Sequence, residues 1–590
     1  MARYHCDDMR KSLCGSLSIT KISWIAAVFV LATPAFADPA VATAEGKSGM
    51  VVAAQREASA AGLAILKAGG NAVDAAVAVG YALAVVDPCC GNIGGGGFML
   101  IHLAGAAARE SSDTFVNFRE TAPEAANPGM YLDGAGNPIR DASRDGYRAV
   151  AVPGTVRGLD LAQTRYGKLK RDAVMAPAIA LARDGFVLGP GDAVIFARDA
   201  KRLAADPEAA RIFLHPDGRF YGVGERLVQP DLAATLEKIA AEGPDAFYRG
   251  AIPISLAQAS ATHGGLLSET DFADYTATEL PPLTCDYRGY HIVSAPPPSS
   301  GGTTLCEILD IVSGWDIGAA GFHSPRAVHL TVEAMRRAFF DRNSVLGDPD
   351  FVANPVGHLL SAHYAATLRD YIEADKATPS REIDDVPAAG EKPQTTHYSV
   401  VDGEGNAVAV TYTLNGGFGA GVVAPGTGFL LNNEMDDFAV KPGTANKFGL
   451  VQGDANAIRP RKRPLSSMAP TIVEPLGAEK DGRPVLVLGS PGGPRIITAV
   501  LETLMNLVDF GMSPGDAVAA SRFHQQYLPD TVFYETGGLS APTLSALRAM
   551  GYSFEEQAPW GAVELIAICP DGTLLGVNDP RRPAGAALGY

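Results

Sequence analysis

One abrupt change in composition constrains this chain more than any other feature. Residues 375–393 are polar and hold three prolines, which is typical of an exposed or mobile segment. Directly after them, residues 397–402 and 407–414 alternate as two strands around a glycine-containing turn. The pattern from about residue 154 to 372 is mostly helical. Strands grouped with flanking helices predict stacked sheets covered by helices.

The flanking sequence adds elements to this outline. Residues 51–86 are Ala-rich with a helical pattern, split at residues 69–71 by two glycines and the good N-cap Asn71. A glycine-rich run at 91–97 leads into a buried strand at 98–103. We expect further strands at 471–473, 484–488, 564–569 and 573–577, and helices at 495–510 and 514–523.

The first residues have the composition of an export signal. Basic residues precede an apolar run at 22–31, and Ala-Phe-Ala at 35–37 fits a small-x-small cleavage site. The apolar run is too short to span a bilayer as a mature helix. We therefore predict a signal peptide at 1–37 and a periplasmic or secreted protein, with no membrane association after signal removal. An uncleaved N-terminal anchor is the alternative.

Charge and motif content argue against several classes of function. The formal net charge is −17, which disfavours nucleic acid as a partner. The chain has no His-Glu-x-x-His, no Cys-x-x-Cys, no Walker phosphate loop and no Gly-x-Ser-x-Gly elbow. We therefore expect no metal and no cofactor. The glycines at 94–97 precede a strand, so they predict close backbone packing, or else a close approach to a ligand, and not a dinucleotide fingerprint.

The cysteines are sparse. There are seven, and two of them, Cys6 and Cys14, lie in the predicted signal. The remaining five are an odd number, and a bridge between the adjacent Cys89 and Cys90 would be strained. We therefore expect buried free thiols and not a disulfide framework.

The most informative residue is Thr395, which opens the first strand after the polar segment. A cut between Gln394 and Thr395 would give this threonine a free α-amine, whose pKa of roughly 7.7–8.0 lets it act as base to its own hydroxyl. The same hydroxyl could make the cut by attacking the preceding carbonyl. The alternative is that Thr395 and Thr396 reflect only the preference of threonine for strands.

The surrounding motifs support the interpretation of Thr395 as a nucleophile released by a cut. The segment 395–415 resembles the start of the small subunit of the γ-glutamyltranspeptidases, which are N-terminal-nucleophile hydrolases. The resemblance continues, in order along the chain, at 91–99, NFRETAP (117–123), AMRRAFFDR (334–342), GFLLNNEMDDF (428–438), KRPLSSMAP (462–470), GSPGGP (489–494) and DPR (579–581).

This resemblance implies a fold and a division of the chain. The fold is a four-layer αββα sandwich in the α/β (α+β) class, formed jointly by two subunits. The large subunit would be residues 38–394, ending in the mobile polar linker 375–394, and the small subunit would be residues 395–590. The two fragments would remain together as a heterodimer.

The resemblance also implies roles for individual residues. Thr395 would be the nucleophile, Thr413 would hydrogen-bond its hydroxyl, and the backbone N–H groups of Gly492 and Gly493 would stabilise the oxyanion. The α-carboxylate of a γ-glutamyl group would be bound by Arg119, Ser466 and Ser467. Its α-amino group would be held by Asn415, Glu434 and Asp437.

Each of these residues also has an ordinary structural explanation. Arg119 could form a surface salt bridge, the two acids could be solvated loop charges, and the serine and glycine pairs could be turns. We interpret His397 as structural, because a lone strand histidine is more often packed than catalytic. The loop between Phe438 and Gly449 resembles the lid over the site in this family, and it carries Phe448 where many bacterial relatives have tyrosine. Position 434 is glutamine in some relatives.

Three functions follow, in decreasing order of support. The first is a γ-glutamyltransferase and glutathione hydrolase, with glutathione or other γ-glutamyl compounds as donors and water, amino acids or peptides as acceptors. The second is a sister amidase such as a cephalosporin (glutaryl) acylase, whose substrate lacks the α-amine that Asp437 would bind. The third, a non-enzymatic binding protein, predicts a lost nucleophile, whereas both threonines are present.

Overall fold

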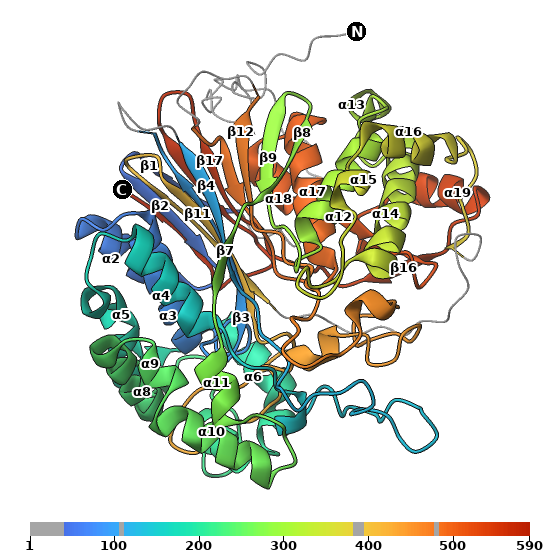
Figure 1. Cartoon of the computed structure of the whole chain (residues 1–590). Helices are drawn as coiled ribbons and strands as arrows, with labels where there is room; N and C mark the ends of the chain where they lie inside the picture. The colour runs from blue at the N-terminus through green and yellow to red at the C-terminus, as the bar shows by residue number, and fades with distance from the viewer. Residues whose placement is uncertain (1–40, 106–110, 381–394, 477–482) are drawn as a thin grey trace, which may run out of the picture.

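Two seven-stranded sheets lie face to face in the centre of the molecule (Figure 1). The structure is a computed structural model that describes residues 41–105, 111–380, 395–476 and 483–590. All strand pairs in the two sheets are antiparallel. The first sheet has the order β19 (Ala586–Gly589), β2 (Gly49–Ala53), β10 (Thr396–Asp402), β11 (Ala407–Thr413), β3 (Gly96–Leu103), β4 (Ser112–Phe118) and β7 (Thr278–Leu280). The second has the order β1 (Ala42–Gly46), β18 (Leu574–Asn578), β17 (Glu564–Ile568), β13 (Leu486–Leu488), β12 (Thr471–Pro475), β9 (Tyr290–Ser294) and β8 (Leu283–Tyr287).

Helices cover the outer face of each sheet. On the first sheet lie α2 (Arg56–Lys67), α3 (Ala72–Val86) and α4 (Thr155–Tyr166), backed by α5 (Arg171–Asp184) and α8 (Pro230–Glu242). On the second lie α12 (Gly301–Val312), α14 (Pro325–Val345) and α17 (Arg495–Val508). Along β2, Val51 packs toward the first set of helices and Val52 toward the second sheet, as the alternation of a buried strand requires. The predicted four-layer αββα sandwich is confirmed.

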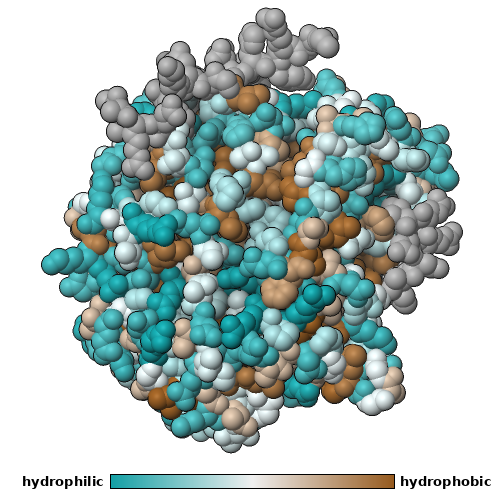
Figure 2. Space-filling view, in the orientation of Figure 1, coloured by the Kyte–Doolittle hydropathy of each residue, from teal (hydrophilic) through white to brown (hydrophobic). Residues whose placement is uncertain are grey.

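The remaining elements surround this sandwich. They are α6 (Pro190–Leu203), α7 (Pro207–Phe213), α9 (Asp245–Tyr248), α10 (Ala251–Thr262), α11 (Glu269–Asp274), α13 (Ile317–Ala320), α15 (Val356–Leu359), α16 (Ala362–Asp370), α18 (Pro514–Ala519), α19 (Ala541–Ala549), β5 (Phe186–Val187), β6 (Arg226–Leu227), β14 (Phe523–His524), β15 (Val532–Glu535) and β16 (Phe554–Gln557). Exposed large apolar side chains are dispersed over different elements, for example Val194, Val223 and Tyr371. Figure 2 shows hydrophilic residues between the apolar ones on the same face.

Local signals located several boundaries correctly. Asn71 caps α3, with its side chain accepting from Val73 and Asp74 while Asp74 accepts from the Asn71 backbone. The strands expected at 397–402 and 407–414 are β10 and β11. Three expectations were wrong in part. Residues 49–53 form β2 and not the start of a helix, the hairpin β8–β9 lies inside the supposedly helical middle region, and the helix expected at 514–523 ends at Ala519.

The polar segment is anchored where the structure describes it. Ser380 is fully buried, and its hydroxyl donates to the Tyr527 carbonyl while its N–H donates to Asp530. The N–H of Ala377 donates to the Met550 carbonyl. Asp375 and Lys376 are exposed, as expected, but the expectation of an exposed segment was wrong for residues 377–380. The signal peptide at 1–37, the linker residues 381–394 and Gln394 lie outside the described residues.

The expectation of free thiols was also wrong. Cys89 and Cys90 form a disulfide, and Cys285 on β8 is bonded to Cys306 on α12. Cys569 is disulfide-bonded as well. The pairing of Cys285 with Cys306 joins a strand to a helix that covers the same sheet, a contact that only the folded chain creates. In the described part of the chain, no helix has the length and apolarity needed to cross a membrane.

Close backbone packing explains the glycine run, as the sequence predicts. A Cβ atom on Gly95 would lie 1.9 Å from the Thr413 carbonyl oxygen, and one on Gly97 would lie 2.4 Å from the Thr411 carbonyl oxygen. Both contacts are impossible for a side chain, so only glycine lets β3 start this close to β11. The run thereby fixes the end of the strand that carries Thr413.

Candidate active site

Two threonines meet where β10 begins and β11 ends. Thr396 pairs with Tyr412 in the antiparallel register, which brings Thr395 beside Thr413. The two hydroxyl oxygens are 3.2 Å apart, and Thr395 is 4% exposed. The Thr413 hydroxyl also accepts from the backbone N–H of Asn415, at 2.7 Å. Asn415 has a φ of +74°, a left-handed conformation that turns the chain back toward this hydroxyl.

A cavity opens at these threonines. It brings together eight of the residues selected from the sequence, namely Arg119, Thr395, Thr413, Asn415, Asp437, Ser466, Ser467 and Gly493. The other two, Glu434 and Gly492, are immediate neighbours of the cavity, the first through Arg119 and the second through Gly493. The sequence analysis missed the remaining lining residues, Arg342, Asn446, Leu450, Gln452, Leu465, Met468, Pro494 and Ile496, as parts of the site.

Arg119 is the centre of a buried charge cluster. Its guanidinium is 2.7 Å from Glu434 Oε2, 2.5 Å from Asp437 Oδ2 and 3.5 Å from Glu120 Oε2. Burial opposes the charge of Arg119, but the three carboxylates outweigh it and raise its pKa. Arg119 is therefore not a surface salt bridge. In this structure it is paired with the acids that were expected to hold the substrate's amine.

The cluster holds more carboxyl groups than cations. Burial raises the pKa of Glu434 well above its usual range, against the opposing charge of Arg119, and it raises the pKa of Glu120 to about 7. Three carboxylates around one guanidinium cannot all ionise without mutual repulsion. An ammonium group brought beside Asp437, which faces the cavity, would relieve that repulsion.

Arg342 is a buried cation at the cavity wall that the sequence analysis did not single out. It projects from α14, is 1% exposed and lines the cavity. It donates to the side-chain oxygens of Ser300 (2.9 Å), Asn343 (2.8 Å) and Ser467 (2.8 Å), all of which are neutral. Burial lowers the pKa of Arg342 to about 10. The motif 334–342 contained it, but nothing in the local pattern distinguishes it from the three other arginines nearby.

The serine pair faces the same space. Ser467 Oγ accepts from Arg342, which leaves its own O–H free to point elsewhere, and Ser466 Oγ accepts from the Met468 N–H at 3.1 Å. The Ser466 carbonyl accepts from both the N–H and the hydroxyl of Ser300. The pair is thus held by the start of α12 and by α14, and not by a simple turn.

Gly492 and Gly493 lie at the end of the cavity where α17 starts. Their φ angles are +141° and +57°, which favour glycine. The carbonyls of both accept the first turn's N–H groups, from Arg495 and Ile496. The positive end of the α17 dipole is therefore close to the threonines, where it favours negative charge.

A loop following Phe438 covers the cavity. Asn446, Phe448, Leu450 and Gln452 line it from this side. The loop is tied down at its tip, where Gln526 Nε2 donates to the Phe448 carbonyl at 2.9 Å, and at its base, where Gln452 donates to the Asp437 carbonyl. Phe448 is 9% exposed and lines the cavity with a ring that has no hydroxyl to hydrogen-bond.

His397 lies on β10, between the two sheets, and does not line the cavity. It is fully buried between the hydroxyls of Thr411 and Ser399, at 2.8 and 3.1 Å, and burial lowers its pKa to about 3. A Cβ on Gly489 would collide with its ring, so the second sheet packs directly on it. Its interpretation as a packed, neutral residue is confirmed.

Comparisons with known proteins identify the family of the chain. The family model described as gamma-glutamyltranspeptidase matches residues 58–589. The glutathione hydrolase proenzyme of Pseudomonas sp. (strain A14) is 50% identical over 92% of this chain and 94% of its own, and that of Escherichia coli (strain K12) is 47% identical over 92% of each. The crystal structure of a cephalosporin acylase from Bacillus halodurans superposes with a TM-score of 0.81 at 28% identity, covering 96% of this chain and 99% of the acylase. Because the family model covers residues 58–589 and these two proenzymes are 47–50% identical over most of the chain, the chain belongs to the γ-glutamyltranspeptidase family.

Proposed function

We propose that this protein is a γ-glutamyltransferase and glutathione hydrolase that cuts itself before Thr395. The observation that carries the proposal is the contact between the Thr395 and Thr413 hydroxyls, 3.2 Å apart, in a cavity that also presents Arg119, Arg342 and Asp437. A nucleophile with a hydroxyl partner and charges of both signs suits a substrate that is an α-amino acid at one end and an amide at the other.

The first reaction would be the cut. The Thr395 hydroxyl attacks the carbonyl of Gln394, its proton moves to the departing nitrogen of Thr395, and the peptide bond becomes an ester. Water then hydrolyses the ester, which leaves residues 38–394 with a carboxylate and residues 395–590 with a free α-amine. The two fragments share the first sheet, because β2, β3 and β4 flank β10 and β11 there, and this supports a stable heterodimer.

The second reaction would be acyl transfer. The α-amine of Thr395 takes the proton of its own hydroxyl while the oxygen attacks the γ-carbonyl of the donor. Thr413 orients that hydroxyl, and the backbone N–H groups of Gly492 and Gly493, with the α17 N-terminus, stabilise the oxyanion. The departing amine takes the proton, and water or another amine then attacks the ester and releases the γ-glutamyl group.

The charges around the cavity select the substrate. Arg119, Arg342, Ser466 and Ser467 offer donors for an α-carboxylate, while Asp437, Glu434 and Asn415 surround the place for an α-ammonium. A glutaryl side chain has no ammonium, so it would leave the acid cluster uncompensated at a cost of about 1–3 kcal/mol. This favours a γ-glutamyl donor over a glutaryl substrate. The acylase is retained as the alternative because the fold is similar to that of a cephalosporin acylase.

A denaturing gel and two substrates test the proposal. The purified protein should run as two fragments, from about Asp38 to Gln394 and from Thr395 to Tyr590, and a periplasmic extract should contain them. Thr395→Ala should remain one band and release no product from a γ-glutamyl anilide. A wild-type protein that never cuts would refute the mechanism. A cut protein that hydrolyses glutaryl amides but ignores γ-glutamyl amides would establish the acylase instead.

A further inference from the structure

The C-terminal segment brings a cation, Arg582, to Thr395. Arg582 lies between β18 and β19, and its Nη2 is 3.5 Å from the carbonyl oxygen of Thr395, a residue 187 positions away. The same guanidinium is 3.7 and 3.9 Å from the Cys90 sulfur and 4.0 Å from Asp87 Oδ1. Its side chain is 15% exposed. None of the motifs that indicated the active site assigns Arg582 a role.

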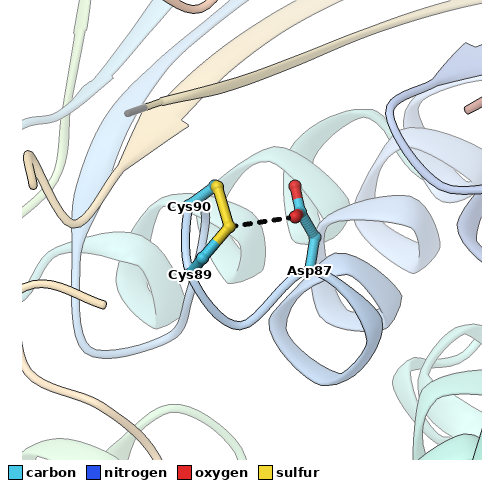
Figure 3. A group of neighbouring side chains, drawn as sticks. All are labelled: Asp87, Cys89 and Cys90. Carbon is cyan, nitrogen blue, oxygen red and sulfur yellow. Dashed lines mark hydrogen bonds between the residues drawn. A yellow bond between two sulfur atoms is a disulfide. The ribbon is translucent and has the colours of Figure 1, made fainter. Parts of the chain in front are cut away.

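The buried turn at residues 87–90 contacts this arginine. Figure 3 shows Asp87 pointing toward the disulfide of Cys89 and Cys90, with Asp87 Oδ1 3.2 Å from the Cys89 sulfur. All three residues are at most 2% exposed. The carbonyl of Cys90 accepts from the Leu414 N–H, at 3.0 Å. The turn therefore holds both the strand end that follows Thr413 and the guanidinium that contacts Thr395.

The position of the guanidinium matters for the freed amine. Within one residue the amide nitrogen and carbonyl oxygen are at most about 3.6 Å apart, so the Thr395 nitrogen lies within roughly 7 Å of Nη2. A cation at that range disfavours protonation of an amine. Only the unprotonated amine can take the hydroxyl proton.

We propose that Arg582 is a positioning residue for the nucleophile, which fixes the Thr395 carbonyl and keeps the freed α-amine in its neutral, basic form. Asp87, 4.0 Å from the guanidinium, opposes this effect. Burial raises the pKa of Asp87 to about 6, while Arg582 acts to lower it, so this carboxylate is ionised above that pH and partly cancels the cation. The inference rests on the proposed role of Thr395 as an N-terminal nucleophile.

Other charged groups face Thr395 from the elements around it. From the cavity side these are Arg119, Arg342 and Asp437. The charges of Arg582, Asp87 and Asp579 act on Glu564 at the start of β17, and the charge of Asp192 acts on Asp87. Glu564 is buried, and burial raises its pKa well above its usual range, which disfavours its charged form. Asp579 is paired with Arg522 at 2.6 Å and Arg581 at 3.1 Å. Arg582 is the cation that contacts Thr395 itself.

The test is the acid limb of the pH dependence of kcat/KM for a γ-glutamyl anilide, measured on protein shown by gel to be cut. Removing the cation in Arg582→Gln should move this limb to higher pH by about 0.5–1 unit, because the amine then protonates more readily. Removing the opposing carboxylate in Asp87→Asn should move it to lower pH. Arg582→Lys should keep the wild-type limb, and Arg140→Gln, at a fully exposed arginine, is the matched control.

Opposite shifts distinguish an electrostatic role from mere loss of structure, which would lower the rate without moving the limb. The proposal would be overturned if the acid limbs of Arg582→Gln and Asp87→Asn stay at the wild-type pH, or if both move in the same direction. If Arg582→Gln is not cut, the pH profiles of Asp87→Asn and Arg582→Lys test the proposal: the first limb should move to lower pH and the second should stay at the wild-type pH. A Thr395→Ala protein that is still cut and active would instead refute the proposed function, so the two failures are separable.

Discussion

Replacing Arg342 by methionine should separate substrate binding from stability. The side chain of Arg342 is buried at the cavity wall, and its hydrogen-bond partners are all neutral oxygens. Methionine keeps much of the aliphatic volume but removes the charge and the fork of donors. The donor's α-carboxylate would then be left with Arg119, which is already shared among three acids.

The magnitude follows from the geometry at Ser467. A carboxylate oxygen accepting from the Ser467 hydroxyl at about 2.7 Å would lie roughly 4.5 Å from the Arg342 nitrogen that is 2.8 Å from the same hydroxyl. At an effective dielectric constant of about 20, two unit charges at that distance attract by roughly 3–4 kcal/mol. If about half of this survives solvent and neighbouring charges, the loss is roughly 2 kcal/mol, or about 30-fold in KM.

Stability should respond differently. Because burial lowers the pKa of Arg342 to about 10, its charge is held in the fold at a cost, and removing it offsets the loss of its hydrogen bonds. We expect the Tm of Arg342→Met, measured in the uncut Thr395→Ala background, to stay within a few degrees of the parent. Arg342→Lys, which keeps the charge but not the fork, should lose roughly fivefold in KM.

The assay is the initial rate of anilide release over a range of γ-glutamyl donor concentrations. A KM within twofold of wild type, at equal kcat, would show that Arg342 does not contribute to carboxylate binding. A large fall in Tm would show that the residue is mainly structural and would refute the reasoning from burial.

Three further changes test other parts of the site. Thr413→Val should lower kcat about 10- to 100-fold while Thr413→Ser restores it, because valine breaks the 3.2 Å contact with Thr395 and leaves the Asn415 N–H without its acceptor, a loss of about 1–3 kcal/mol. Asp437→Asn should raise the KM for the donor at least tenfold. Glu434→Gln should leave that KM within about threefold of wild type near neutral pH, because burial favours the neutral carboxyl at 434. An equal rise in KM in both variants would contradict this reasoning. For His102, burial acts to lower the pKa, but Asp113 and Glu474, at 2.8 and 3.0 Å, raise it to about 9. The two carboxylates therefore stabilise the fold fully below about pH 6.5, and this stabilisation is lost as the pH rises to about 9. It is worth at most about 3 kcal/mol. The difference in Tm between His102→Asn and its parent, both in the uncut background, should therefore shrink over that interval.

Sequence patterns located the elements that depend on local rules. The N-cap at Asn71 places the start of α3, and the alternation in 397–414 places β10 and β11, because capping and strand periodicity involve neighbouring residues only. The strand β2 was hidden because its apolar residues run directly into those of α2. The hairpin β8–β9 was missed because it interrupts a long helical region and is defined by pairing with β12.

The site divides in the same way. The resemblance of short motifs to a family supplied the residues that the structure gathers around Thr395. Arg342 and Arg582 could not be found in this way, because what distinguishes them from other arginines is burial next to Ser467 and contact with the Thr395 carbonyl. The two disulfides were missed for different reasons. A bridge between the adjacent Cys89 and Cys90 was rejected as strained, and a count of cysteines does not say that the fold brings Cys285 to Cys306.

The contact of Arg582 gains weight from what the proposed cut does to Thr395. Cutting frees the amine but also removes the covalent bond that held Thr395 on its amino side, so the nucleophile must be fixed by what remains. The remaining constraints are the strand that starts at Thr396, the hydroxyl of Thr413 and the guanidinium at its carbonyl oxygen. Of these, only the guanidinium carries a charge that acts on the amine. The residue that helps to hold the nucleophile in place is therefore also the one placed to tune the base.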